Sequence, residues 1–125
     1  MSNLLRNAIR TPDGTILESF HRHDYKTHTD TNGKTYMIDG GLDYVRCSAH
    51  EDQEWIGLYD DDPFDEIRLR FRWGTRGKNG DQPLQFKPLH RLEDDHIRAI
   101  LKTQTHIPQY VAKQFEKELA WRGKN

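Results

Sequence analysis

The sequence predicts an α+β fold, in which an N-terminal antiparallel β-sheet is followed by a short helix and two C-terminal helices packed on it. Thr, Tyr, Val and Ile alternate with polar residues over 15–59, which is typical of half-buried strands. An Asp-Pro pair then starts a helical pattern, and two later segments repeat apolar residues at helical spacing. We expect a single domain over 1–125, with the sheet over about 12–59 and helices over about 62–73, 93–104 and 108–122.

Short turn-forming clusters separate the predicted strands. The clearest hairpin spans residues 25–38, because Asn32-Gly33 supplies two residues that tolerate positive φ in a tight turn. The paired glycines of Asp39-Gly40-Gly41 predict a sharp reversal or a close approach of two backbones. Further strands are expected at 42–47 and 53–59, and in the latter Ile56 and Leu58 share one face.

The first helix is expected to have Asp62 as its N-cap and Pro63 at its first helical position. Gly74 and residues 77–81 predict a flexible loop that ends this helix. Each helix has one apolar face that is expected to pack in the core or on the sheet. These faces are Phe64, Ile67 and Phe71; Ile97, Ile100 and Leu101; and Val111, Phe115 and Leu119.

The composition favours one small, polar domain. Only 34% of residues are hydrophobic and 31% are charged, so we expect a homo-oligomer, a dimer or higher, to add stability. The net charge of -1 gives no bulk positive field for general nucleic-acid binding. Cys47 is the only cysteine, which excludes an internal disulfide. We find no signal peptide or membrane-spanning segment, and therefore expect a cytoplasmic protein that does not bind membranes.

Two stretches of the sequence carry charge of one sign only. Residues 51–66 hold eight acids and no base and are expected to form a solvated face. Residues 68–78 hold five bases and no acid. We expect Arg68, Arg72 and Trp73, or Arg72 and Arg76, to converge with the neighbouring glycine-rich loop on a single anion.

The segment 73–81 has a composition that suits nucleotide recognition. Its glycines let backbone N–H groups approach phosphate oxygens, and Trp73 offers a stacking face for a base. Arg76 and Lys78 supply charge, while Asn79 or Asp81 can bond to polar edges. The alternative is an ordinary surface loop whose tryptophan closes the core and whose lysine is solvated.

The densest polar cluster is His-Arg-His-Asp-Tyr at 21–25, which is expected where a strand begins, with both histidines on one face. Such a pair can bind a metal if a third and fourth ligand are close. The candidates for completing that shell are His28, His50 and Asp24. The alternative is that the imidazoles bond to backbone and to carboxylates such as Asp39 or Asp43, and we therefore predict no metal and no other cofactor.

The sequence favours binding over catalysis. Cys47 has no evident base beside it and is expected to be a small buried hydrophobe. The chain has no Gly-x-Ser-x-Gly motif and no phosphate-cradling lysine loop. It also lacks the two separated His-x-Thr/Ser elements of a two-histidine phosphoesterase.

Three segments carry a resemblance to a known family. They are His21-Arg22-His23-Asp24-Tyr25, Asp39-Gly40-Gly41-Leu42-Asp43-Tyr44 and the run Trp-Gly-Thr-x-Gly-Lys-Asn-Gly-Asp at 73–81. With these motifs, most of the chain resembles a family of small bacteriophage accessory proteins. The resemblance implies zinc binding for cysteine-containing relatives of the middle motif, whereas this chain has Thr and His where cysteines would be needed.

The arrangement of a sheet followed by helices is also similar to that of the phage anti-Thoeris sponges. Those proteins sequester cyclic ADP-ribose isomers made by bacterial immune TIR enzymes, some also hold cyclic trinucleotides, and they assemble as dimers or larger oligomers. The resemblance implies a phage anti-defence protein in the host cytoplasm, which binds a cyclic nucleotide immune signal without cleaving it.

The ligand-binding residues are expected from side-chain chemistry, because a nucleotide presents phosphates, flat bases and polar edges. The candidates are Arg22, Arg46, Arg72, Arg76 and Lys78 for phosphate; Tyr25, Tyr44 and Trp73 for stacking; and His21, His23, Asp24, Asp43, Asn79 and Asp81 for hydrogen bonds. Arg122 is expected to reach a site across a subunit interface. Two alternatives stay open: an inhibitor of a host nuclease or CRISPR complex that acts through residues 51–66, and a metal-dependent phosphodiesterase that uses His21 and His23.

Overall fold

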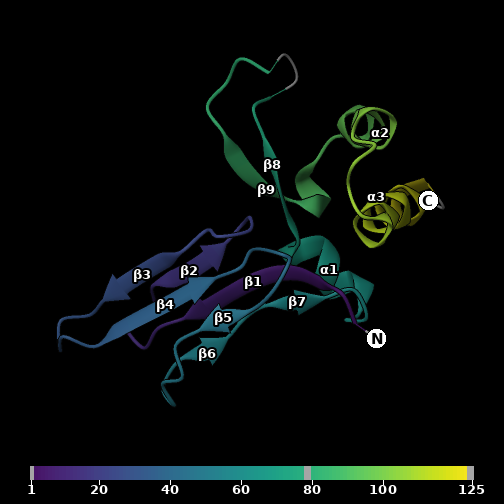
Figure 1. The fold of residues 1–125 in the computed structure, drawn as a ribbon. Coiled ribbons are helices and arrows are strands. Elements are labelled where there is room, and N and C mark those ends of the chain that lie inside the picture. The colour runs from purple at the N-terminus through teal and green to yellow at the C-terminus, as the bar shows by residue number, and fades with distance from the viewer. Residues whose placement is uncertain (1, 78–79, 124–125) are drawn as a thin grey trace. The chain divides into compact units, whose positions relative to one another are not determined.

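A computed structural model describes residues 2–77 and 80–123 (Figure 1). Antiparallel strands come first in the chain, a short helix follows, and two longer helices end it, which confirms the predicted α+β class. The chain forms two compact units, Met1–Tyr59 and Asp60–Asn125. The boundary lies where the predicted strands give way to the predicted helices.

The first unit is organised by a strand that the sequence analysis did not predict. Strand β1, Leu4–Arg10, pairs antiparallel with β2, Ile16–Ser19, and also with β6, Glu54–Trp55, and β7, Leu58–Tyr59 (Figure 1). Five of its seven residues are buried, so polar and apolar positions do not alternate along it. A strand buried on both faces lacks the period-two signal on which the prediction relied.

A second sheet in this unit contains the predicted hairpin. Strands β3, Lys26–Thr29, and β4, Thr35–Asp39, pair antiparallel, and the short β5, Arg46–Cys47, pairs with β4. The turn is wider than predicted, because Gly33 has a φ of 81° while Asn32 is not among the residues with positive φ. Asp30 Oδ1 instead accepts the N–H groups of Asn32 at 3.0 Å and Lys34 at 2.9 Å.

Two other predicted strands are shorter than expected. Only Arg46–Cys47 of the segment 42–47 is a strand, because the backbone turns at Gly40, whose carbonyl accepts the N–H groups of Asp43 and Tyr44. Segment 53–59 is divided into β6 and β7, and Ile56 and Leu58, which were expected to share one face, are both buried. The half-buried Cys47 packs against a core of Ile9, Leu17, Tyr36 and Ile38.

The second unit begins with a helix that is shorter than predicted. Helix α1 spans Phe64–Arg70, and its N-cap is Pro63, not Asp62, since the Pro63 carbonyl accepts the N–H groups of Glu66 and Ile67. The chain then becomes extended at Phe71 and forms β8, Arg72–Thr75, which pairs with β9, Gln85–Pro88. The last turn of the helix that was expected to continue to residue 73 is therefore replaced by the first strand of a hairpin. The hydrogen bonds between β8 and β9 satisfy the backbone N–H and C=O groups there.

The C-terminal helices agree with the prediction. A short 3-10 turn, η1, Leu89–Arg91, leads to α2, Asp94–Thr103, and α3, Gln109–Gly123, follows. Their apolar faces bury Ile97, Ile100, Val111 and Phe115. No helix among the described residues has both the length and the apolar character needed to cross a membrane.

Candidate functional site

The first two sequence motifs meet in the first unit, but not as the predicted strand. Residues 21–25 form a turn, in which the Asp24 N–H bonds to the His21 carbonyl at 3.0 Å and His23 has a φ of 65°. The expected alternation of side chains between two faces is therefore wrong. A non-glycine residue with positive φ is strained, and such strain persists only where surrounding contacts hold it.

The expected close approach at the paired glycines is confirmed. A Cβ atom added to Gly41 would lie 2.3 Å from the His21 carbonyl carbon, and one added to Gly40 would lie 2.0 Å from the Tyr44 carbonyl oxygen. Both glycines also have positive φ, 108° at Gly40 and 56° at Gly41. Only glycine permits this contact between the two motifs, because any side chain would collide with backbone.

Buried polar groups from β1 and β2 hold the two motif loops together. The Asn7 Nδ2 group lies 2.9 Å from the carbonyl oxygens of Asp39 and Gly41 and 3.1 Å from that of Tyr44. The Ser19 hydroxyl accepts the Gly41 N–H at 2.8 Å and donates to the Asp24 carbonyl at 2.7 Å. Asn7 and Ser19 were not predicted as partners, although an asparagine among the apolar residues of 4–9 is the kind of polar group that such a network satisfies.

Several predicted ligand residues in these loops bond to one another. The Tyr44 hydroxyl donates to Asp39 Oδ2 at 3.3 Å and lies 3.3 Å from His23 Nδ1. Arg46 pairs with the same Asp39 oxygen at 3.2 Å, and its guanidinium lies 5.9 Å from the centre of the Tyr25 ring. The carboxylate of Asp39 therefore binds Tyr44 and Arg46, and neither motif histidine contacts it directly as the alternative to metal binding had expected.

Among the other predicted ligand residues of the first unit, Asp24 has bonded partners, whereas three side chains are exposed. Asp24 accepts the Phe20 N–H at 2.8 Å and lies 3.4 Å from Lys26 Nζ. Partial burial opposes its ionisation, but these two partners outweigh that effect and hold the pKa of Asp24 below its ordinary value. The other side chains, those of His21, Arg22 and Asp43, are exposed.

A separate hydrogen-bonded group joins the turn after β1 to β3. His28 Nε2 lies 2.8 Å from Asp13 Oδ2 and 3.3 Å from the Thr15 hydroxyl, and the Thr11 hydroxyl donates to Asp13. The Thr11 and His28 contacts hold the pKa of Asp13 well below its ordinary value. Within 2–77 and 80–123, no three His, Cys, Asp or Glu side chains gather closely enough to hold a metal ion.

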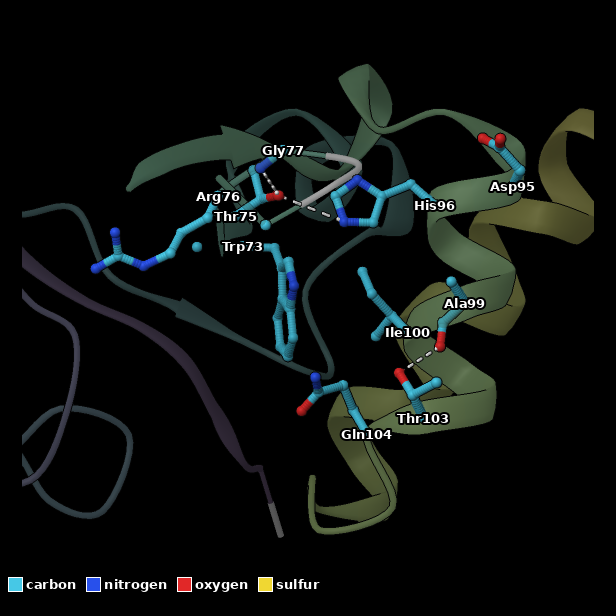
Figure 2. Close-up of a pocket in the computed structure, with 12 residues that line it drawn as sticks. Trp73, Thr75, Arg76, Gly77, Asp95, His96, Ala99, Ile100, Thr103 and Gln104 are labelled. Atoms are coloured by element: carbon cyan, nitrogen blue, oxygen red, sulfur yellow. Dashed lines mark hydrogen bonds between the residues drawn. The ribbon is translucent and has the colours of Figure 1, made fainter. Parts of the chain in front are cut away.

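The second unit contains a pocket of about 640 Å³ beside Trp73 (Figure 2). Strand β8 supplies Trp73 and Thr75 from one of its faces, and one side of α2 supplies His96, Ala99, Ile100 and Thr103. Trp73 is held by an edge-to-face contact with Phe115, with ring centres 5.1 Å apart. The pocket thus has a rigid aromatic wall that faces a helix.

Polar groups lie at both ends of this pocket. At one end, His96 Nε2 lies 3.5 Å from the Thr75 hydroxyl, which also accepts the Gly77 N–H at 3.1 Å. At the other end, Figure 2 shows the Gln104 amide below the Trp73 ring. The pocket therefore combines an apolar centre with a few directional donors and acceptors, as small-molecule sites usually do.

The contribution of α2 to this pocket was missed in the sequence. We assigned the helix only a core face, yet His96, Ala99, Ile100 and Thr103 follow the i, i+3, i+4, i+7 spacing of a single stripe. A histidine and a threonine on a stripe that also carries a buried isoleucine were the available signal.

The expected convergence of arginines on one anion does not occur. Arg68 binds the buried Glu118 through two bonds of 2.8 and 2.9 Å, and Arg72 Nη2 donates to the Phe86 carbonyl at 3.5 Å. Arg76 borders the pocket, but Figure 2 shows its side chain extending away from Trp73 and His96. The guanidinium groups of Arg68 and Arg72 are therefore bonded to a carboxylate and to the backbone of the hairpin.

Arg122 also has partners within its own unit. Its Nε donates to Glu118 at 2.7 Å, its Nη1 to Asp94 at 2.6 Å, and its Nη2 to the carbonyls of Leu89 and His90. These bonds occupy donors that a ligand across an interface would need, which argues against the role expected for Arg122. Of the other candidates, Asp81 is exposed and outside the pocket lining, whereas Lys78 and Asn79 lie outside the described residues.

The acidic segment 51–66 is partly neutralised by neighbouring bases. Asp52 pairs with Lys34 at 2.9 Å and Glu54 with Arg10 at 2.9 Å. The Lys34 contact, helped by the Tyr36 hydroxyl, holds the pKa of Asp52 below its ordinary value. Glu66 lies 3.9 Å from Arg70 on α1. These pairs weaken the case for an uncompensated acidic surface that mimics a nucleic acid.

Comparison with known proteins gave no match: no family model, no curated protein and no solved structure is significantly similar to this chain.

Proposed function

We propose that the protein binds a small nucleotide in the pocket beside Trp73 and sequesters it without cleaving it. The observation that carries the proposal is the size and lining of that pocket. Its volume of about 640 Å³ lies within the range of roughly 300–1,000 Å³ that small-molecule sites occupy. An indole, a histidine and an amide in such a space match the ring and polar edges of a base.

Binding without cleavage is supported by the state of the hydroxyl nearest to a base. Thr75 already accepts the Gly77 N–H, and its 3.5 Å separation from His96 Nε2 is at the limit of a hydrogen bond. An activated nucleophile needs a closer base that a third group orients. The pocket is therefore better suited to holding a ligand than to attacking it.

The biological setting of the proposal comes from two resemblances, that of the three motifs to small bacteriophage accessory proteins and that of the sheet-then-helices arrangement to the phage anti-Thoeris sponges. They indicate that the ligand is a cyclic nucleotide immune signal, either a cyclic ADP-ribose isomer or a cyclic oligonucleotide, and that the protein acts for a phage against host defence. Capture lowers the free concentration of such a signal in proportion to the amount of protein and its affinity.

The test uses a variant that fills the pocket. Ala99 lines it, so Ala99→Phe should remove the heat of binding of cyclic ADP-ribose isomers or cyclic oligonucleotides in calorimetry. Ala120→Phe, an equal change at an exposed position on α3 outside this pocket, should bind like wild type. Protein incubated with the ligand and then heated should release it with unchanged mass. No heat with any of these ligands at micromolar protein, or release of a cleaved product, would refute the proposal.

A further inference from the structure

A second, smaller cavity adjoins the Trp73 pocket. It has a volume of about 210 Å³ and shares four lining residues with the larger one, namely Thr75, Gly77, Asp95 and His96. This volume is below the range of whole drug-sized ligands, so the cavity suits one group of a larger molecule. Its position suggests a second compartment for the same ligand.

Two basic side chains distinguish the smaller cavity from the larger. Lys87 lines it from β9, and Arg91 lines it from the end of η1. Lys87 is the direct cross-strand partner of Trp73 in the β8–β9 ladder, so the two side chains lie on the same face of the hairpin. A ligand that contacts the Trp73 ring therefore has a cation beside it.

Lys87 and Arg91 differ from the arginines that hold the second unit together. Arg68 and Arg122 are bound by Glu118, whereas the side chains of Lys87 and Arg91 make no hydrogen bond or ion pair with any other described residue. Both side chains are exposed at the cavity, so an incoming anion would not have to displace an internal partner. Charge-assisted bonds to phosphate are formed most readily by such side chains.

The cavity also contains acceptors. Glu93 and Asp95 line it together with the Gln82 amide. Carboxylates repel phosphate but accept hydrogen bonds from ribose hydroxyls, as acidic residues do in dinucleotide sites. A mixture of two cations and two carboxylates therefore fits a sugar phosphate better than it fits a bare polyanion.

We infer that this cavity is the sugar-phosphate subsite of the ligand whose base lies against Trp73, with Lys87 and Arg91 binding the phosphate. The inference rests on the proposed function and makes it more specific. The ligand is a nucleotide whose phosphate and base are spaced to reach both compartments, and a free nucleoside should bind much more weakly.

The test compares cyclic ADP-ribose with adenosine by calorimetry. Lys87→Ala and Arg91→Ala should each weaken cyclic ADP-ribose binding about tenfold, because each removes one charge-assisted bond, and should leave adenosine binding unchanged. Arg98→Ala is the matched control, since Arg98 is an exposed base on α2 that lines neither cavity. If wild type binds cyclic ADP-ribose and both variants bind it equally well, the subsite is refuted and the proposed function stands.

A second measurement tests the subsite without a base. Inorganic pyrophosphate added to the ¹⁵N-labelled protein should shift the amide signals of Thr75, Gly77 and His96, and Lys87→Ala together with Arg91→Ala should abolish these shifts. Unchanged signals in wild type would overturn the inference. If cyclic ADP-ribose and adenosine both fail to bind while pyrophosphate still shifts these signals, the proposed function fails for these ligands and the anion site remains.

Discussion

At the scale of single residues, the motif chemistry of the first unit is largely structural. Asn7, Ser19 and Asp39 connect the loops that contain the first two motifs, and the glycines at 40 and 41 let those loops touch. The close approach at the glycines could be predicted, because paired glycines are typical of sharp turns and of places where two backbones come close together. The buried partners could not, since which loop a lone asparagine or serine will bond depends on the tertiary fold.

Gly41 and Gly14 allow steric collision to be separated from backbone strain. Both have positive φ, but a Cβ atom at Gly41 meets the His21 backbone at 2.3 Å, whereas at Gly14 it meets nothing within 4 Å. We expect Gly14→Ala to lower the free energy of unfolding by about 1 kcal/mol and Gly41→Ala to lower it by about 3 kcal/mol or more. Urea unfolding followed by circular dichroism measures both, and equal losses would show that the loop contact does not constrain Gly41.

At the scale of elements, the success of prediction depended on periodicity. Helices α2 and α3 were predicted because isoleucine, valine and phenylalanine recur at helical spacing. Strand β8 was missed because three of its four residues, Arg72, Trp73 and Gly74, are only partly buried, so no alternation appears. Gly74 lies within this strand opposite Phe86, whose ring would be 2.9 Å from a Cβ atom. In the sequence this glycine indicated a loop, but in the structure it makes room for an aromatic ring.

Glu118 links α3 to α1 and η1, and its loss should be costly. The side chain is fully buried and bonds to Arg68 and to Arg122, which also reaches the η1 carbonyls. Glu118→Gln removes the carboxylate that pairs with Arg68 and one of the two that pair with Arg122, so we expect a loss of about 3 kcal/mol in the free energy of unfolding. Glu116→Gln, at an exposed position on the same helix, should change it by less than about 0.5 kcal/mol. Thermal or urea unfolding of the two variants makes the comparison.

At the scale of the whole molecule, the strand and helix halves of the sequence correspond to the two compact units, 1–59 and 60–125. Composition and patterning sufficed for the fold class because each half has its own hydrophobic period. The candidate site was predicted only in part. Trp73 lines the pocket as its chemistry suggested, but the position of the α2 residues opposite it, the pairing of Arg68 with Glu118 and the pairing of Arg122 with Asp94 depend on contacts between distant segments.

The predicted single domain has a direct thermodynamic test. A unit of about 60 residues buries only about 60% of the surface of its unfolded chain and is marginally stable by itself, so we expect both units to unfold together. In a urea titration followed by NMR, the amides of Ala8 on β1 and Phe115 on α3 should lose native intensity at one midpoint. Two separated midpoints would show that the chain contains two independently folding domains.

The pairing of β1 determines when its sheet can be completed during synthesis. Two of its three partner strands lie near the other end of the first unit, since Ile9 is opposite Trp55 and Leu4 is opposite Tyr59. During translation, β1 leaves the ribosome before the strands that complete its hydrogen bonding, so it waits with an incomplete ladder. Deletion of residues from Leu4–Arg10 would remove hydrogen-bonding partners from β2, β6 and β7 together.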